Sequence, residues 1–453
     1  MNIGGDDKNV FPYISDNVGG DRQRIDVSKT AQWEVLFEHA DHIGMYLHFK
    51  TQETENDQLL DGGNLGNERK LYYRELIARF SHHLALHWNL GEENTNSIAQ
   101  LESFANFFKE LDPYDHPIVV HTFPGQKETV YGPLVGFSNL DGASLQSSPS
   151  NVFSDTLEWR DRSAVGGHSW VVACDEQGNA QTGVVPDSVD PNHDVIRENV
   201  LWGNIMAGGA GVEYYFGYGY PNSDLTCQDF RSRANMWDQS RYALEFFNLN
   251  AIPFWNMATG SCVSTGWCLA ESSGDHLVVY LKDGGSANIN LPGPGGDTWT
   301  VKWYDPRNGG TLQNGSVTTL GSSSSPQALG NAPNNGTKDW VILLRRSSTP
   351  TTPLPTLNPV TPEPTPAPVV KPTTSKPTSA PIEPSTPQPT HQPVSGGMEE
   401  CESDCDLDSD CASQLLCADA HKPELKAAGY DVRKAYCGPS GDTLEVCYDP
   451  TKL

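Results

Sequence analysis

The sequence predicts an α/β fold class: a (β/α)8 TIM-type barrel that lacks its first strand, followed by an all-β sandwich, a disordered linker and a small disulfide-rich module. Three observations support this. In residues 1–254 apolar helical patterns alternate with short β-rich runs, which is typical of parallel βαβ units. In residues 255–346 the helical patterns stop, and Gly, Pro and Asn turns separate the β-rich runs. Residues 347–397 are rich in Pro, Thr and Ser, and cysteines crowd residues 398–453.

Helices and strands are expected to alternate through the first region. The predicted strands are 45–49, 86–90, 118–122, 142–146, 170–174 and 211–215. The predicted helices are 33–43, 71–80, 98–111, 152–160, 195–206 and 230–247. With a remnant strand near Ile3, the count falls about one short of eight, as it would if the N-terminal strand were missing. No Gly-rich phosphate loop follows any strand, so a barrel is favoured over a doubly wound sheet.

Composition limits the class of partner and the compartment. The 30 Lys and Arg against 57 Asp and Glu give a net charge of -27, which argues against nucleic acid as a partner. No apolar run is long enough to span a membrane. The clustered cysteines and the sequons that begin at Asn314 and Asn335 predict an extracellular or cell-wall-associated protein, although the first residues do not form a signal peptide. Met1 would then be an internal methionine.

Two predicted strands end in pairs of acidic residues. Glu92 and Glu93 follow the strand at 86–90, and Asp175 and Glu176 follow the strand at 170–174. Barrel active sites lie at these carboxyl ends, and glycoside hydrolysis needs two carboxylates that flank the scissile bond. A single acid at such a position more often caps the next helix. Two pairs on different strands favour catalysis.

Several sequence runs resemble the apiosidase-like branch of the clan A glycoside hydrolases. They are YYRELIARF (72–80), HWNLGEEN (87–94), HTFPG (121–125), GVEYYFG (211–217) and DFRSR (229–233). Further on, WYDPRNG (303–309) resembles the β-domain of a collagen-binding (collagenase) type that often follows. The resemblance implies an acid/base at the end of the fourth strand, Glu93, and a nucleophile at the end of the seventh, Glu176. Glu92 stands where the family has Asn, so Glu92 and Asp175 are the alternates within each pair.

Other residues are candidates for contact with substrate. These are Asp6, His121, Trp202, Tyr215 and Tyr218, each of which could instead be a packing or capping residue. No cofactor and no metal site are predicted. Asp406, Asp408 and Asp410 have the spacing of a calcium loop, but Cys411 occupies the position that requires Gly. The chain has no His-Glu-x-x-His motif, so collagenase activity is disfavoured.

The cysteines predict local cross-links. Cys262 and Cys268 are close enough to close a small loop, and Cys174 and Cys227 could bridge adjacent strand ends. The cysteines after residue 400 allow 15 pairings. The leading function is a secreted, retaining glycoside hydrolase acting on a plant or algal cell-wall polysaccharide, with the tail binding cell wall or matrix. The alternative is a non-catalytic carbohydrate- or matrix-binding protein on a degenerate barrel.

Overall fold

The computed structural model describes residues 11–14, 22–224, 226, 228–291, 297–347, 416–419 and 445–448. The chain divides into two compact units, Met1–Thr356 and Leu357–Leu453, and each is described by itself. The larger unit holds the barrel-like region and the β-domain. No helix in the described part of the chain has the length and apolar composition needed to cross a membrane.

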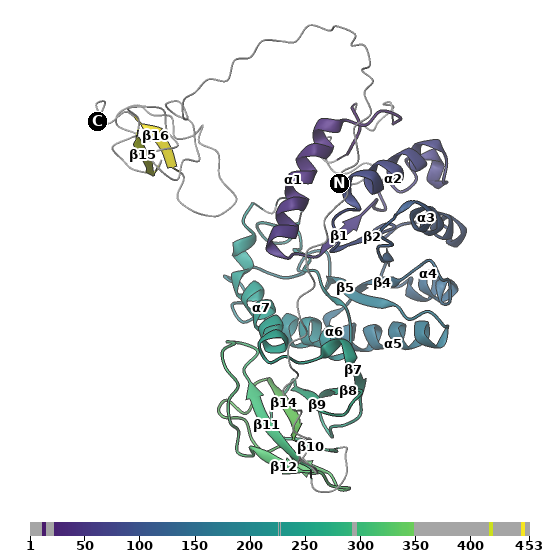
Figure 1. Ribbon diagram of the computed structural model, residues 1–453. Coiled ribbons are helices and arrows are strands. Elements are labelled where there is room, and N and C mark those ends of the chain that lie inside the picture. The colour runs from purple at the N-terminus through teal and green to yellow at the C-terminus, as the bar shows by residue number, and fades with distance from the viewer. Residues whose placement is uncertain are drawn as a thin grey trace, which may run out of the picture. The chain divides into compact units, whose positions relative to one another are not determined.

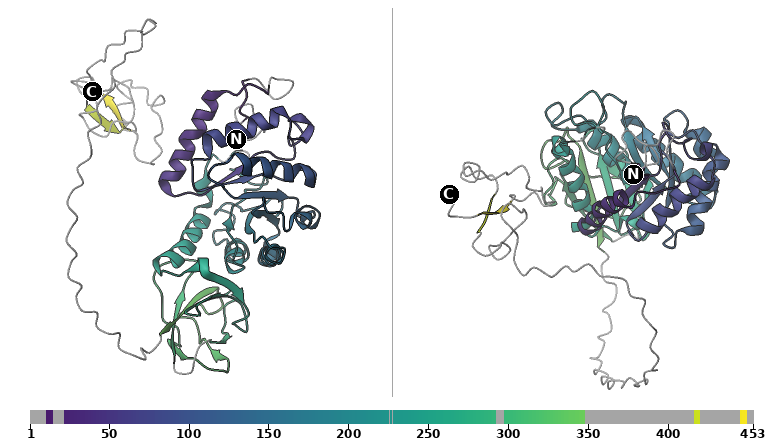
Figure 2. Two further views of the ribbon diagram at one scale, coloured as in Figure 1. Left: turned by 45° about the vertical axis from the view of Figure 1, so that its right-hand side comes forward. Right: turned by 90° about the horizontal axis from the view of Figure 1, so that it is seen from above.

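A parallel sheet of six strands forms the centre of the first region, with the strands side by side in chain order. They are β1 (Leu47–Lys50), β2 (Leu86–Asn89), β3 (Ile118–Thr122), β4 (Gly142–Ser147), β5 (Val171–Gln177) and β6 (Gly211–Val212). The helices are α1 (Val27–Ile43), α2 (Asn67–Phe80), α3 (Ile98–Leu111), α4 (Lys127–Leu134), α5 (Val152–Val165), α6 (Trp202–Met206) and α7 (Ala234–Leu249). Figures 1 and 2 show them along the outer side of the sheet. This arrangement confirms a TIM-like part-barrel.

Local signals explain where the helices begin and end. The Asp26 carboxylate accepts hydrogen bonds from the backbone of Ser28 and Lys29 and so caps α1, which ends at Gly44 with φ of 74°. Ser97 and Gln100 form a capping box at the start of α3. Helix α4 was not predicted from the sequence, because Pro133 interrupts its short pattern. The predicted helix at 195–206 is divided into a π-helical segment, Ile196–Leu201, and α6.

The two faces of the parallel sheet differ in polarity. Side chains alternate along each strand, and the outer set, which includes Phe49, Trp88, Leu145 and Val172, is packed in the apolar layer beneath the helices. The inner set is polar instead: it consists of His48, Lys50, His87, Asn89, His121, Ser144 and Gln146. A barrel interior lined by imidazole, amide, hydroxyl and ammonium groups is a costly core. It is better suited to contact a polar ligand.

Strands β1 and β6 form the two edges of the described sheet. Glu213, directly after β6, reaches β1 through its side chain: its Oε2 lies 2.7 Å from Nδ1 of His48, and its Oε1 lies 3.1 Å from Nζ of Lys50. Ion pairs therefore connect the edges where a complete barrel would have backbone pairing. These pairs also place charged groups inside the sheet.

The β-domain follows as an antiparallel sheet of order β12-β11-β14-β9-β8-β7. Its strands are β7 (Met257–Gly260), β8 (Trp267–Glu271), β9 (His276–Leu281), β11 (Thr298–Tyr304), β12 (Thr319–Gly321) and β14 (Trp340–Ser347). A two-stranded ribbon, β10 (Asn288–Ile289) with β13 (Gln327–Ala328), completes it. One face of the large sheet contributes Trp299, Trp303 and Trp340 to an apolar core of its own. The predicted disulfide between Cys262 and Cys268 is present.

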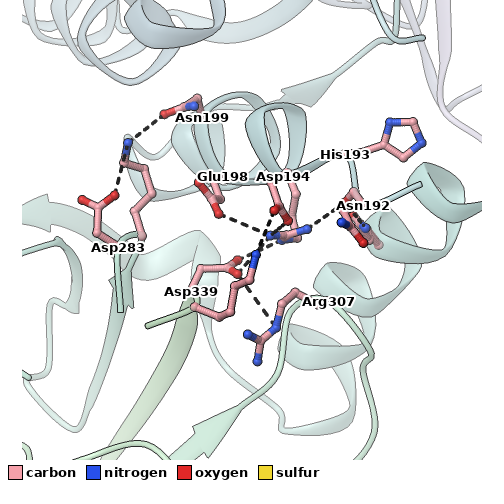
Figure 3. Close-up of polar contacts among 12 residues, drawn as sticks. Asn192, His193, Asp194, Glu198, Asn199, Asp283, Arg307 and Asp339 are labelled. Carbon is pink, nitrogen blue, oxygen red and sulfur yellow. Dashed lines mark hydrogen bonds and ion pairs between the residues drawn. The ribbon is translucent and has the colours of Figure 1, made fainter. Parts of the chain in front are cut away.

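The other face of this sheet packs on the barrel-like region. Tyr280 and Leu343 of the β-domain belong to one apolar core with Trp202 and Phe246 of the barrel. Beside this core, Arg197 forms a buried bidentate ion pair with Asp339, with Nε–Oδ2 of 2.9 Å and Nη2–Oδ1 of 3.0 Å. Tyr280 also donates its hydroxyl to Asp339 Oδ2 at 2.8 Å. Figure 3 shows the polar residues that surround this pair.

The smaller unit has one described element, a ribbon of β15 (Leu416–Asp419) and β16 (Glu445–Tyr448). The strands are antiparallel, and their register places Cys417 opposite Cys447. The other tail cysteines, the Asp406–Asp410 pattern and the Pro-rich segment lie outside the described residues. Asp6 and Cys227 also lie outside them.

Candidate active site

The candidate site lies at the carboxyl ends of β2, β4 and β5. Glu92 and Glu93 follow β2, Gln146 is near the end of β4, and Asp175 and Glu176 are near the end of β5. The amide Nε2 of Gln146 donates to Oε1 of Glu93 at 2.6 Å, and Gln146 also hydrogen-bonds to Glu176. One amide thus contacts one acid from each predicted pair. The structure brings both acidic pairs together at the carboxyl end of the parallel sheet, which is called the mouth below.

A β-bulge lets two consecutive acids face the interior. Leu145 of β4 is paired with Cys174 of β5, but the next residue, Gln146, is paired with Glu176, so Asp175 is the extra residue. In a regular strand Asp175 and Glu176 would lie on opposite faces. The bulge instead turns both side chains inward, and both are buried. It therefore adds a second carboxyl group to the interior.

Glu93 occupies an unusual backbone conformation. Its φ is 44°, in the left-handed region that side chains other than Gly and Asn seldom adopt. Asn94 holds the turn by donating Nδ2 to the carbonyl oxygens of Gly91, at 3.1 Å, and His121, at 3.2 Å. Strain of this kind costs about 1–3 kcal/mol and is found most often at functional sites. Here it accompanies the contact between Glu93 and Gln146.

Burial changes the acidity of both predicted catalytic carboxyls. It raises the pKa of Glu176 to about 7, and the nearby charges of Glu92 and Glu93 act in the same direction. The Gln146 hydrogen bond and Lys50 oppose this shift but do not cancel it. Burial also raises the pKa of Glu93. Both groups can therefore exchange a proton closer to neutral pH than an exposed glutamate can.

His121 is completely buried beside Glu176. Its Nε2 lies 3.7 Å from Oε2 of Glu176 and has no hydrogen-bond partner among the described residues. Ser144 Oγ lies 3.3 Å from the other ring nitrogen. Burial, with the charges of Lys50 and His48, lowers the pKa of His121 well below the usual range. The ring is therefore neutral, and its Nε2 is free to contact a ligand.

A second set of charges extends the site toward β1 and β6. Lys50 Nζ lies 3.0 Å from Oε2 of Glu92 and 3.1 Å from Glu213. His48 Nδ1 lies 3.7 Å from Oδ2 of Asp175. Although burial opposes it, Lys50 and His48 hold the pKa of Glu213 below its usual range, whereas burial raises the pKa of Asp175. The alternates Glu92 and Asp175 are thus each beside a basic side chain.

Sequence reasoning missed Lys50, His48, Gln146 and Glu213. A signal for Lys50 was present, because it immediately follows the predicted strand at 45–49, at the same level as the acids. Glu213 lies within the predicted strand at 211–215 and was not considered. Gln146 ends a weak strand pattern, Gly-Ala-Ser-Leu-Gln, that carries no charge. Its importance comes from its position opposite Glu176.

The aromatic residues that were predicted to contact substrate differ in their position and exposure. Tyr215 and Tyr218 follow β6, with ring centroids 6.0 Å apart, and Tyr218 is half exposed. Gln177, next to Glu176, donates its Nε2 to the Tyr215 carbonyl oxygen at 3.3 Å, which places Tyr215 near the acids. Burial raises the pKa of Tyr215. The prediction for Trp202 was wrong. Its ring is completely buried against Tyr280 of the β-domain, 5.1 Å between centroids, so no face is open to a sugar.

Two further questions concern thiol and metal chemistry. Cys174 is a buried free thiol, and its suggested partner Cys227 lies outside the described residues. Burial raises the pKa of the Cys174 thiol, which disfavours the nucleophilic thiolate. Glu92, His121 and Glu176 present ligand atoms within 4.8 Å of one another, as do His48, Asp175 and Glu213. Lys50 is ion-paired with an acid of each set. Its ammonium supplies the positive charge there, so we assign no metal to the mouth.

Comparisons with known proteins agree with this architecture. Residues 259–345 match the family model described as "Putative collagen-binding domain of a collagenase". A search of the curated proteins found no match. Among solved structures, a glycoside hydrolase of family 5 from Bacteroides vulgatus ATCC 8482 is similar, with a TM-score of 0.53 and 15% identity over 70% of this chain and 74% of that chain. A second structure, described as "Glycoside hydrolase", has a TM-score of 0.53 and 14% identity over 70% of this chain and 77% of that one. At such identity the likeness shows the fold: this chain has a glycoside-hydrolase-type part-barrel followed by a β-domain.

Proposed function

We propose that this protein is a retaining glycoside hydrolase that acts on a plant or algal cell-wall polysaccharide. One observation carries the proposal: two carboxyls from different strands share the Gln146 amide at the carboxyl end of the sheet. In the proposed reaction Glu93 is the acid/base and Glu176 is the nucleophile. Glu92 and Asp175 are the alternates for these roles.

The mechanism requires the two carboxyls in different protonation states. Glu93 donates its proton to the glycosidic oxygen while the Glu176 carboxylate attacks the anomeric carbon, which forms a glycosyl ester on Glu176 and releases the leaving group as an alcohol. Glu93, now ionised, removes a proton from water. That water attacks the anomeric carbon, breaks the ester and restores both acids. The raised pKa of Glu93 suits the first step.

The remaining polar side chains suit recognition of sugar hydroxyls. His121, Tyr215 and Tyr218 are proposed to contact the substrate, as is Asp6. Lys50 lies beside Glu92, and its charge also lowers the pKa of Glu176. It would therefore favour the ionised nucleophile. We further propose that the protein is extracellular or cell-wall-associated and that its cysteine-rich tail binds cell wall or matrix.

A second candidate function is non-catalytic binding of carbohydrate or matrix. Two observations favour it: the described sheet has six strands joined at its edges only by side chains, and residues 259–345 match the collagen-binding family model. An open edge removes substrate contacts that a closed barrel provides. The two functions differ in one result, namely whether a bound glycan is cleaved.

The test compares hydrolysis and binding on a panel of plant and algal polysaccharides. Wild type should release reducing ends, and NMR should show a product of retained configuration. Azide should restore activity to Glu93→Gln on a substrate with a good leaving group. Glu158→Gln, on the exposed face of α5, is the control and should behave as wild type. Binding without cleavage by wild type would reject the enzyme and support the second function.

The pH profile separates the two roles. Because Glu176 must be ionised to attack and its pKa is about 7, turnover should rise as pH increases through 7. If turnover instead falls through the same range, Glu176 is the proton donor and the two roles are exchanged.

A further inference from the structure

A second cluster of ligating side chains lies away from the mouth. Glu34 and Asp41 are on α1, and the paired residues His82 and His83 form part of the turn that follows α2. Figure 1 shows α1 and α2 side by side, and the two helices pack against each other. This turn leads into the beginning of β2, whereas the candidate active site follows the end of that strand. The proposed glycosidase reaction makes no use of these residues.

The geometry of this cluster matches that of a tetrahedral metal site. Oε1 of Glu34 lies 2.9 Å from Nε2 of His82 and 3.4 Å from Nε2 of His83. The three ligand atoms all lie within 4.8 Å of one another. Ligand atoms bound tetrahedrally to zinc at about 2.1 Å lie about 3.4 Å apart. An ion could therefore enter with only small movements of the side chains.

The hydrogen bonds of His83 leave one ring nitrogen directed at this position. His83 is 1% exposed, and its Nδ1 lies 2.7 Å from Oδ2 of Asp41. An ionised carboxylate only accepts, so Nδ1 carries a hydrogen, and in the neutral ring Nε2 keeps a lone pair. That buried Nε2 has no hydrogen-bond partner in the described part of the chain and faces the Glu34 carboxylate. In that form the two electron-rich atoms repel each other unless a proton or a metal ion lies between them.

The surroundings favour zinc over other cations. Carboxylate, histidine and metal in sequence is the usual arrangement around a bound imidazole, and Asp41 supplies the outer carboxylate here. Two imidazoles with one carboxylate suit zinc, whereas calcium and magnesium prefer oxygen ligands alone. Among the described residues, the ion-pair partners of Glu34 are these two imidazoles, so no ammonium or guanidinium neutralises it. His82 is half exposed, which leaves an entry path and room for a water as fourth ligand.

We propose that Glu34, His82 and His83 bind one zinc ion, with Asp41 orienting His83. The ion would tie α1 to the turn after α2. Helix α1 immediately precedes β1, an edge strand of the described sheet. The charges of Glu34 and Asp41 would balance the divalent ion. The site is thus structural, and it is independent of whether the mouth hydrolyses glycans.

The test uses the full-length protein, stripped with a chelator and dialysed. Zinc is titrated calorimetrically, and cobalt is titrated in parallel because a tetrahedral Co2+ site absorbs visible light. His82→Ala should bind one equivalent fewer than wild type. Glu34→Gln should bind that equivalent at least about tenfold more weakly, and Asp41→Asn should weaken it by about 10–100-fold. Loss of one equivalent, rather than a total count, excludes interference from the tail cysteines.

The matched control is His39→Ala, which removes an exposed imidazole from the same helix. This variant should bind zinc as wild type does. Zinc should raise the melting temperature of wild type and of His39→Ala, but should raise that of His82→Ala less. His82 and Glu34 lie at the surface, so both variants should fold. If both bind as many equivalents as wild type with the same affinity, the proposal is wrong and the cluster is only a set of ion pairs.

Discussion

Buried charges occur in two regions of this molecule, and the two regions treat them differently. At the junction with the β-domain, Arg197 contacts both oxygens of Asp339 through Nε and Nη2. Its Nη1 donates to the Asn192 carbonyl oxygen, and Nη2 also donates to Asp194. At the mouth, several buried polar atoms have no hydrogen-bond partner in the described part of the chain. Among them are Oδ2 of Asp175, Nε2 of His121 and Oε1 of Gln146.

The difference indicates a difference in role. A buried ion pair whose donors and acceptors are all satisfied fixes one arrangement of two domains and leaves little for a ligand to contact. Unpartnered buried polar atoms cost free energy in the absence of a ligand, about 1–3 kcal/mol each. They also accompany the raised pKa of Glu176 and the lowered pKa of His121. Shifted acidity together with unsatisfied polar atoms is typical of a functional site.

The largest expected effect is a loss of turnover caused by a substitution at the mouth that leaves the domain junction intact. Glu176→Gln removes the proposed nucleophile and keeps the size of the side chain. Turnover should fall by about three to five orders of magnitude, as it does when a residue that forms the covalent intermediate is lost. Initial rates on the accepted glycan measure the loss, and circular dichroism checks that the fold is intact. A decrease smaller than about tenfold would remove Glu176 from the reaction.

The next largest effect is a loss of stability caused by a substitution at the domain junction that leaves the mouth intact. Arg197→Met leaves the buried Asp339 with the Tyr280 hydroxyl at 2.8 Å and the more distant Arg307 guanidinium at 3.9 Å. The free energy of unfolding should fall by about 3–5 kcal/mol, because the buried carboxylate loses its closest counter-charge. Denaturant unfolding measures the change. Lys338→Ala removes the exposed pair with Asp194 and is the control, with an expected loss below about 1 kcal/mol. Equal losses in both variants would contradict this prediction.

Sequence periodicity predicts the strands and the positions of the acids, but it does not predict the contacts between side chains on different strands. Alternation of patterns placed Glu92 and Asp175 near strand ends, because both faces of each strand have a recognisable polarity. The bulge at Asp175 leaves no local signal, since an extra residue is defined only by its partner strand. Trp202 was misassigned for a related reason. An aromatic residue on a helix has the same pattern whether it faces a sugar or a second domain, and here it faces Tyr280.

The third prediction concerns how the stability of the protein depends on pH through Glu176. The pKa of Glu176 rises from the model-peptide value of 4.5 to about 7 in the folded protein. The folded state therefore holds this proton more tightly than the unfolded state. Stability is highest below about pH 4.5 for this group and decreases as pH rises to about 7. The loss from this group is about 3 kcal/mol, at 1.36 kcal/mol per pKa unit.

Glu176→Gln cannot ionise, so it should remove this part of the pH dependence. The variant should match wild type near pH 4 and be the more stable protein at pH 8. Urea unfolding at both pH values measures the two differences. The matched comparison at the junction is Arg197→Met, which should be destabilised at both pH values. If Glu176→Gln is no more stable than wild type at pH 8, ionisation of the buried Glu176 does not lower the free energy of unfolding, and the prediction is wrong.

The smallest expected effect concerns the rim of the mouth. Tyr218 is half exposed and contacts Tyr215, so it can present a ring to a sugar without being needed for folding. Tyr218→Ala should weaken glycan binding by about 0.5–1.5 kcal/mol, the usual contribution of one aromatic contact. It should change the free energy of unfolding by less than about 0.5 kcal/mol. Trp202→Ala is the opposite case, because it should cost about 3–5 kcal/mol of stability through the cavity it leaves. Calorimetric titration of the Glu176→Gln background with an oligosaccharide separates binding from cleavage. If Tyr218→Ala binds the oligosaccharide as tightly as the same background with Tyr218 does, Tyr218 has no role in recognition. The buried polar side chains of the mouth would then account for glycan binding.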